Sequence, residues 1–452
     1  MGKNRQNKEK KNKVPRRALF GKGSRFSEWW NGLWSRVGNI AGVREMVETE
    51  EEPSEPIDFS APSVPYYTEL SKKFNLARIV LYMVLFAFLV VTLVSSQQMI
   101  TYENLYYLVK DINAESVTAQ SCADHLNYPV SRATPSFAAF RGGMVVAGGE
   151  EITALSGSGK QTLSDNVALS NPCVSAGDRY FVAFSRGEKN FSVYNSFVRT
   201  AHRLTEYPVY DACMGADGCL AVLTRSQDYA SEVIWYNGKM NKLGVCHLGG
   251  YVTAMTISQD SRTLAVLSME TEDGAYKSKI TLLRRGSGGA VTHQEVTTDG
   301  APLGAYFVTE ERLCVIYDRG FGVYRVDGQE VTQVTFEDRE PLLWGCSTGY
   351  FAVLGQENDT LTERVLWVYD RNGAEVYTAE LGQTEKYSSL VMDGQNVYLL
   401  GVGHILGVRN QGKRLETATV ERNTLALMVD TKGRLMALTP SYARYVDNGN
   451  FS

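Results

Sequence analysis

The stretch Leu366–Gly373, LWVYDRNG, joins a run of aliphatic and aromatic residues to a polar turn that ends in glycine. Aliphatic and aromatic residues of this kind favour a strand, and Asp, Asn and Gly favour the turn that follows it. The same register returns at intervals of about forty residues, which is typical of repeat architectures. Its eight copies are Ile152–Gly159, Phe191–Phe197 (without the glycine), Val233–Gly238, Ile280–Gly286, Val323–Gly328, Leu366–Gly373, Ile405–Gly412 and Tyr445–Gly449.

A second pattern lies one predicted strand earlier in most copies and consists of a polar turn followed by a continuous apolar strand. Apolar side chains on both faces predict a strand that is covered on both sides. A β-propeller produces this environment, because each four-stranded blade packs between its neighbours. The examples are Ala216–Leu223, Ser258–Leu267, Gly349–Leu354, Asp393–Leu400 and Lys432–Leu438. The predicted fold is therefore mainly β, a propeller of residues 134–452.

The blade count depends on how the ring closes. We expect eight blades near 134–170, 171–207, 208–248, 249–299, 300–340, 341–385, 386–423 and 424–452. The last blade is one strand short, and a ring must close to hide its edges. A strand near Leu126–Ser131 is predicted to complete it and join the two ends of the ring. Seven blades is the alternative if that segment does not pair there.

Residues 76–98 form a predicted transmembrane helix. The run Ile79–Val94, IVLYMVLFAFLVVTLV, has sixteen residues without a charge, and its flanks extend it to the about 20 residues that a bilayer requires. Basic residues precede the run and none follows until Lys110, so the positive-inside rule predicts a single-pass plasma-membrane protein with a cytoplasmic amino terminus and an extracytoplasmic body. The span residues singled out are Ile79, Leu81, Leu85, Phe86, Phe88, Leu89, Val91 and Leu93.

Residues 1–75 are predicted to form a basic cytoplasmic tail that ends in an acidic, proline-containing linker. The segment Arg25–Arg44 places its apolar residues on one helical face, which favours either a helix lying on membrane lipid or a partner-binding segment. Residues 99–133 are predicted to form a stalk and the ring-closing strand. The candidate membrane-interface residues are Phe26, Trp29, Trp30, Leu33 and Trp34.

Two resemblances follow from these patterns. The segment Ser258–Leu267 resembles the S-P-D-G-x-x-L-A-V turn of WD40-like and TolB-like propeller blades, with Gln259 and Ser261 in place of Pro and Gly. The whole plan resembles an uncharacterised family of membrane-anchored Gram-positive bacterial proteins that carry a degenerate propeller as a domain of unknown function. That resemblance covers nearly the entire chain and implies an architecture, but no activity.

No catalytic, cofactor-binding or metal-binding residue is assigned. The segment Gly157–Lys160 resembles a P-loop, but position 154 is Ala and position 161 is Gln, so it is predicted to be a turn between blade strands. The five histidines lack ligand spacing and no GxSxG motif occurs. The seven cysteines are interpreted as small buried hydrophobic residues, with a Cys213–Cys219 disulfide as a minor hypothesis.

These features favour a non-enzymatic envelope protein whose propeller binds a protein or glycan as a scaffold or sensor. The alternative is an envelope hydrolase or lyase whose site gathers residues from several blades and so leaves no local motif. Beyond Arg78, acidic residues outnumber basic ones by about nine, so nucleic acid is not expected as a partner. Candidate contact residues in loops on the propeller faces are Tyr207, Tyr210, Arg339, Trp344 and Tyr387.

Overall fold

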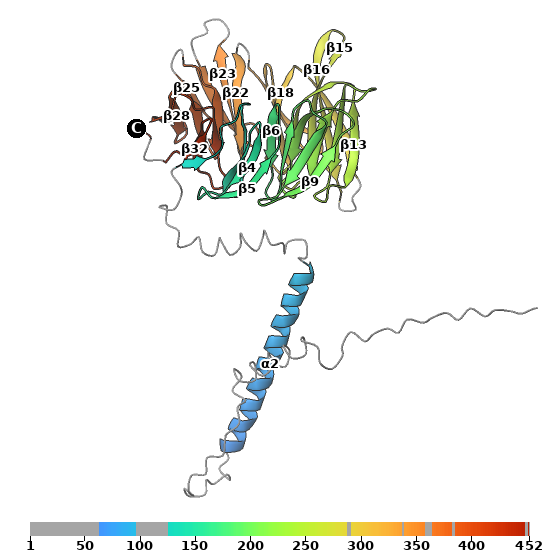
Figure 1. The fold of residues 1–452 in the computed structure, drawn as a ribbon, viewed down its shortest axis with the longest axis vertical. Helices are drawn as coiled ribbons and strands as arrows, with labels where there is room; N and C mark the ends of the chain where they lie inside the picture. The colour runs from blue at the N-terminus through green and yellow to red at the C-terminus, as the bar shows by residue number, and fades with distance from the viewer. Residues whose placement is uncertain are drawn as a thin grey trace, which may run out of the picture. The chain divides into compact units, whose positions relative to one another are not determined.

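The computed structural model describes residues 63–95, 125–286, 291–336, 339–357, 364–381, 385–447 and 451. The chain divides into two compact units, Met1–Ser96 and Gln97–Ser452. In the described residues of the first unit there is one helix, and in those of the second unit there are strands arranged as a ring (Figure 1).

The ring consists of eight antiparallel four-stranded sheets, which confirms a propeller of eight blades. We number the blades in chain order and call the strands of each blade A to D from the axis of the ring outward. Blades 1 to 4 contain β2 (Ser136–Phe140), β3 (Gly143–Ala147), β4 (Glu151–Leu155), β5 (Gln161–Asn166); β6 (Pro172–Ala176), β7 (Phe181–Ser185), β8 (Asn190–Tyr194), β9 (Arg199–Leu204); β10 (Val209–Met214), β11 (Leu220–Thr224), β12 (Ser231–Tyr236), β13 (Lys242–Leu248); and β14 (Tyr251–Ile257), β15 (Thr263–Glu272), β16 (Ala275–Arg285), β17 (Val291–Asp299). Blades 5 to 8 contain β18 (Pro302–Thr309), β19 (Arg312–Tyr317), β20 (Gly320–Arg325), β21 (Glu330–Thr335); β22 (Arg339–Ser347), β23 (Tyr350–Glu357), β24 (Arg364–Asp370), β25 (Glu375–Leu381); β26 (Ser389–Asp393), β27 (Asn396–Leu400), β28 (His404–Arg409), β29 (Arg414–Thr419); and β30 (Ala426–Val429), β31 (Leu435–Leu438), β32 (Tyr442–Tyr445), β1 (His125–Asn127).

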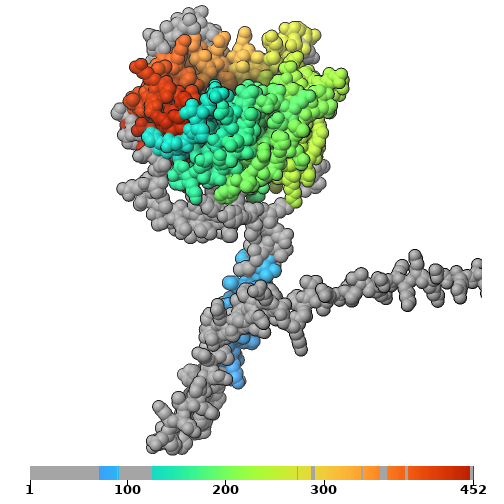
Figure 2. All heavy atoms as spheres, in the orientation of Figure 1, coloured from blue at the N-terminus to red at the C-terminus, as the bar shows by residue number. Residues whose placement is uncertain are grey.

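The first strand of each blade lies innermost. Each A strand contacts the A strand of the next blade, from β2 and β6 through to β30 and back to β2. Serine side chains add hydrogen bonds across these contacts: the N–H of Val174 donates to Ser136 Oγ at 3.2 Å, and the N–H of Met214 donates to Ser175 Oγ at 3.1 Å. On the face shown in the space-filling view, the coloured blades abut without visible gaps (Figure 2).

The amino-terminal strand of the ring closes the last blade, as predicted. Strand β1 pairs antiparallel with β32, with Leu126 opposite Ala443, and so takes the outer D position of blade 8. Leu126 is completely buried, and the Tyr128 hydroxyl donates to the carbonyl of Thr439. The two ends of the ring are therefore held in one sheet, which hides both edges.

The two repeated sequence patterns correspond to the B and C strands. The pattern with a polar turn and a continuous apolar run forms B strands such as β11, which is buried along its whole length. The strand-and-glycine pattern forms C strands, and the glycine follows in the turn to strand D. Gly328 and Gly373 adopt φ of 79° and 81° there, a left-handed conformation that is easiest for glycine. Strand β22 begins at Arg339, close to the blade limit predicted near residue 340.

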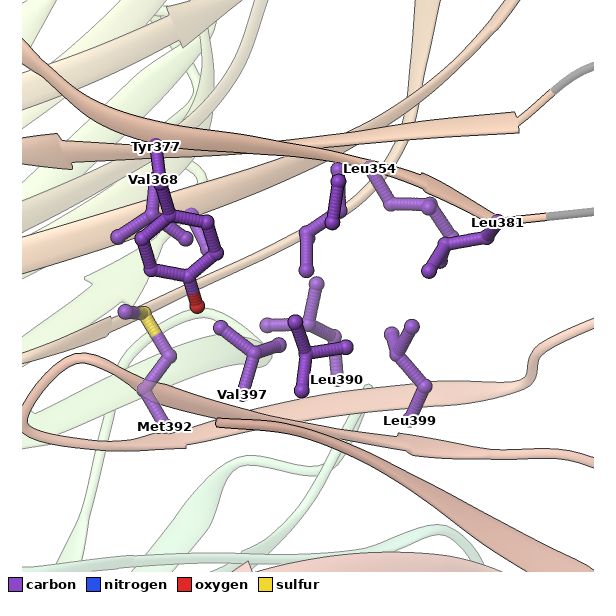
Figure 3. Close-up of a cluster of buried hydrophobic side chains, with 12 residues drawn as sticks. Leu354, Val368, Tyr377, Leu381, Leu390, Met392, Val397 and Leu399 are labelled. Carbon is purple, nitrogen blue, oxygen red and sulfur yellow. The ribbon is translucent and has the colours of Figure 1, made fainter. Parts of the chain in front are cut away.

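The core is distributed between blades. One cluster joins the sheets of blades 6 and 7, and Leu354 and Val368 of one sheet face Leu390, Val397 and Leu399 of the next (Figure 3). Burying each such aliphatic side chain contributes about 1.5–3 kcal/mol. Similar clusters occur between the other neighbours, so each sheet is covered on both faces, as the B-strand pattern predicts.

Helix α2 (Ser63–Ser95) begins earlier than the predicted span. Pro65, the last proline of the predicted linker, lies in its first turn. Proline is tolerated there because backbone N–H groups in the first turn of a helix make no intrahelical hydrogen bond. Its apolar side chains are exposed; Ile79, Leu85 and Phe88 are 56%, 62% and 72% exposed. Among the residues whose side chains are described, no helix has a stretch long and apolar enough to cross a membrane.

Several predictions lie outside the described residues. The side chains of Leu89, Val91 and Leu93 in the predicted span are not described, nor is the predicted stalk of residues 99–112. The same is true of the five candidate membrane-interface residues Phe26, Trp29, Trp30, Leu33 and Trp34. The transmembrane and interfacial assignments therefore stay predictions.

Candidate ligand-binding face

Strand order fixes which loops share a face of the ring. Each A strand starts where the preceding D strand ends, and the chain returns to this level between strands B and C. The D–A connections and B–C loops therefore lie on one face, which we call the D–A face, and the A–B and C–D turns lie on the other, which we call the A–B face.

The structure brings the predicted contact segments to this face but places only two of the five residues in loops. Tyr207 and Tyr387 lie in D–A connections. Tyr210, Arg339 and Trp344 lie within A strands, because β10 and β22 extend further toward the D–A face than the sequence indicated.

Trp344 packs between blades. It is half-buried in β22, and a β-carbon at Gly304 of the neighbouring inner strand would lie only 2.6 Å from its Nε1 atom. Its ring packs against the buried core cluster that contains Val353 and Trp367. Trp344 thus joins blades 5 and 6, and the prediction that it lies in a contact loop is wrong.

A first cluster on the D–A face combines an arginine with two tyrosines. Arg225 follows β11 in the B–C loop of blade 3, and its Cζ lies 4.8 Å from the ring centre of Tyr210 and 5.6 Å from that of Tyr251. The tyrosines come from the inner strands of blades 3 and 4. Both distances are within the range of cation–π attraction. Arg225 is exposed and Tyr251 is 57% exposed, so the cluster is open to solvent.

Asp211 lies beside this cluster on β10, at a register shift in the strand. Burial raises the pKa of its carboxyl group, and the N–H of Ala212, 2.9 Å from Oδ1, together with Arg186 acts in the opposite direction. Burial likewise raises the pKa of Cys173, to which Arg186 is hydrogen-bonded. Burial between blades 2 and 3 therefore disfavours the charged forms of the Asp211 carboxyl and the Cys173 thiol.

A second cluster lies on the same face between blades 6 and 7. Arg364, at the start of β24, has its Cζ 6.0 Å from the ring centre of Tyr387. The Tyr387 hydroxyl donates to Glu385 Oε2 at 3.1 Å, and His404 Nε2 lies 3.2 Å from Glu385 Oε1. Burial, followed by the nearby Glu385 carboxylate, raises the pKa of Tyr387. This tyrosine is therefore a neutral hydrogen-bonding group.

Sequence reasoning missed Arg225, Tyr251, Arg364 and His404. These residues lie at the ends of strands in different blades, and they meet only because the B–C loops and D–A connections share a face. Aromatic residues in the sequence indicated the D–A connections as candidate contact segments. The residues of the B–C loops that lie beside them follow no local sequence pattern that would have indicated them.

The described residues provide no metal site: no group of three or more His, Cys, Asp or Glu side chains among them could hold a metal ion. The P-loop-like segment forms the turn between β4 and β5, as predicted, with the N–H of Gly159 donating to the carbonyl of Ser156. Cys213 and Cys219 are free thiols, so the hypothesis of a disulfide between them is wrong for this structure. Cys122 lies outside the described residues.

A closed ring of eight four-stranded blades with open polar and aromatic clusters on one face defines the chain as a β-propeller protein. A family model for a family of unknown function (DUF5711) matches residues 119–446, and the chain belongs to that family. This match covers the whole ring from before β1 to the end of β32.

Known structures share the propeller architecture at low sequence identity. BamB from Moraxella catarrhalis is 14% identical, with a TM-score of 0.48 over 71% of this chain and 99% of that one. Hydrazine synthase from Kuenenia stuttgartiensis is 12% identical, with a TM-score of 0.46 over 63% and 97%. The Pan2 WD40 domain from Neurospora crassa is 10% identical, with a TM-score of 0.43 over 62% and 89%. No curated protein matches the sequence.

Proposed function

We propose that this chain is a single-pass membrane protein of the cell envelope whose extracytoplasmic propeller binds a protein partner as a scaffold or sensor, without enzymatic activity. The observation that carries the proposal is the presence of two arginine–tyrosine clusters on one face of a closed ring, around Arg225 and Tyr387. Arginine and tyrosine are enriched where proteins bind each other, because both combine a large contact area with hydrogen-bonding groups. A glycan could stack on the same rings.

The exposed apolar helix supports membrane anchoring. Side chains such as Ile79, Leu81 and Leu85 are 56%, 62% and 62% exposed, and contiguous exposed apolar surface marks a membrane or protein interface. A helix satisfies its own backbone hydrogen bonds, as a hydrocarbon environment requires. Lys72, Lys73 and Arg78 lie just before the apolar run Ile79–Val94 and favour an extracytoplasmic ring.

Crosslinked affinity purification of the full-length protein from native membranes, with quantitative mass spectrometry, tests the binding function. We expect one stoichiometric protein partner that is absent when a chain lacking residues 125–452 is purified in parallel. The same proteins with both chains would contradict the proposal. Release of soluble fragments from cell-wall polymers by the purified full-length protein would instead favour the hydrolase or lyase.

Epitope tags at the two ends of the chain test the topology. In cells whose membrane is intact but accessible from outside, added protease should remove the carboxy-terminal tag and leave the amino-terminal tag until the membrane is permeabilised. Replacing Leu85 and Phe86 by Arg should release the protein from the membrane fraction, since a charge near the centre of a span costs about 2.5–3.5 kcal/mol on insertion scales. Protection of the carboxy-terminal tag would reverse the proposed orientation.

A further inference from the structure

Arg225 presents a guanidinium that is held in place but has no hydrogen-bond acceptor among the described residues. Its Cζ atom lies 4.8 Å from the ring centre of Tyr210 and 5.6 Å from that of Tyr251. Aromatic rings attract the positive charge through their faces but do not occupy the N–H groups at the edge of the guanidinium. The N–H groups of Arg225 can therefore donate to an acceptor that belongs to a bound ligand.

The two rings also make the site rigid. Tyr210 and Tyr251 lie on the inner strands β10 and β14 of adjacent blades, and Tyr210 is at the register shift of β10. An arginine on a surface loop ordinarily loses considerable rotamer entropy on binding, and holding it between two strand-borne rings reduces that loss. Arg319 lies in the B–C loop of the next blade but one on the same face. Its side chain is 84% exposed, its Nε lies 4.0 Å from Asp318 Oδ2, and no aromatic ring among the described residues lies over it.

Planar, bidentate hydrogen bonding matches a carboxylate or a phosphate. The surrounding surface decides between them. Asp228 follows in the same loop and is exposed. Glu232 is the second residue of the next strand and lies 3.1 Å from His247, and the hairpin of β15 and β16 carries Glu270 and Asp273 near its tip. These acids repel a ligand with many negative charges. A ligand with a single carboxylate can pair that group with Arg225, and its neutral or basic flanking groups are compatible with the surrounding acids.

We propose that Arg225, positioned by Tyr210 and Tyr251, is the anchor of a docking surface for a polypeptide segment that offers one carboxylate, an Asp or Glu side chain or a carboxy terminus, flanked by neutral or basic residues. This inference rests on the proposed binding function and names its contact chemistry. The carboxylate accepts two N–H groups of Arg225, and exposed Tyr229 and Tyr251, 46% and 57% exposed, supply apolar area beside it.

The test uses the full-length protein in native membranes with the photo-crosslinking residue p-benzoylphenylalanine at Gln227, an exposed position two residues from Arg225. Mass spectrometry of the crosslinked peptide identifies the segment that docks. We expect that segment to contain an acidic residue or a carboxy terminus. A synthetic peptide of that segment should bind the purified full-length protein, and its amide counterpart, with Glu→Gln, Asp→Asn or an amidated end, should bind at least tenfold more weakly.

Three variants complete the experiment. Arg225→Ala should lower crosslinked recovery and peptide affinity at least tenfold, and Arg225→Lys should lower both, since lysine has no bidentate fork. Arg319→Ala is the matched control and should stay within twofold of wild type. Unchanged binding by Arg225→Ala, or a docked segment that is a polyanion or has no carboxylate, overturns the anchor while leaving the binding function intact. Failure to recover any partner by crosslinked purification of the wild-type protein overturns both.

Discussion

Ser261 occupies the left-handed position of the A–B turn in blade 4, where the related sequence motif has glycine. Its φ is 56°, its side chain is 1% exposed, and its Oγ accepts the N–H of Asp217 from the neighbouring blade at 3.1 Å. The left-handed conformation costs a residue with a β-carbon about 1–2 kcal/mol. The hydrogen bond to blade 3 contributes about 1 kcal/mol, so the serine offsets its own strain.

This balance predicts that two substitutions at Ser261 differ in stability. Ser261→Gly loses the hydrogen bond but removes the strain, so its free energy of unfolding should stay within about 1 kcal/mol of wild type. Ser261→Ala keeps the strain and loses the bond, and it should be the less stable of the two by about 1–2 kcal/mol. Denaturant titration of the purified full-length protein measures both. An alanine variant as stable as the glycine variant would show that the turn is not strained there.

Asp217 joins blades 3 and 4 through Arg285, whose Nη2 lies 3.0 Å from Asp217 Oδ2. Burial opposes the charged carboxylate, but hydrogen bonds from Cys219 and Arg285 outweigh it and lower the pKa of Asp217. Since the folded pKa lies below the unfolded value of about 3.9, the ion contributes stability above that pH and loses it as pH falls through the folded pKa.

Asp217→Asn should therefore lower the free energy of unfolding by about 1 kcal/mol at pH 7, and the difference from wild type should be smaller at pH 3, because the stabilisation is lost as the pH falls through the folded pKa of Asp217. Denaturant titrations at both pH values give the comparison. Asp299→Asn is the control, because its carboxylate pairs with Lys277 but is 86% exposed. A constant difference across the pH range would assign the effect of Asp217 to packing.

At the scale of the element, β1 has only three residues, yet it supplies the outer strand of blade 8. Its central residue, Leu126, is 0% exposed and belongs to a cluster with Met144 of blade 1 and Met436 of blade 8. One side chain therefore connects the first blade, the last blade and the closing strand.

Leu126→Asp should place an unpaired charge in this cluster and lower the melting temperature of the full-length protein by several degrees, because the cost is at least about 3 kcal/mol. Leu126→Met keeps the volume and should cost less than about 1.5 kcal/mol. Thermal unfolding followed by tryptophan fluorescence distinguishes them. Equal melting temperatures for both variants would mean that ring closure does not depend on β1.

At the scale of the whole molecule, neighbouring blades share their cores, so no sheet is buried by its own residues alone. Buried cysteines can be used to follow the exposure of these cores. Cys213 and Cys219 belong to blade 3, and Cys346 belongs to blade 6. Burial raises the pKa of each to about 12. A thiol of this kind is a poor nucleophile at pH 8, because reaction requires the thiolate.

We expect the six described cysteines to resist alkylation at pH 8 in the native protein and to react together in one unfolding transition. Pulse labelling across a denaturant series, followed by mass spectrometry of each cysteine peptide, provides the measurement. Labelling of the unfolded protein should be the same with and without reductant for Cys213 and Cys219, which are free. Blade-by-blade exposure would show that the ring does not unfold as a unit.

The sequence by itself determined the repeat, because strand propensity and turn chemistry in segments such as Leu366–Gly373 act locally and recur in every blade. It also located the closing strand near Leu126, because the last repeat lacked a partner for its edge. The extent of the inner strands, and so the true positions of Tyr210 and Trp344, followed only from packing around the axis. The clusters around Arg225 and Tyr387 were likewise decided by tertiary structure, since their members are distant in sequence and meet because closure of the ring directs alternate loops to one face.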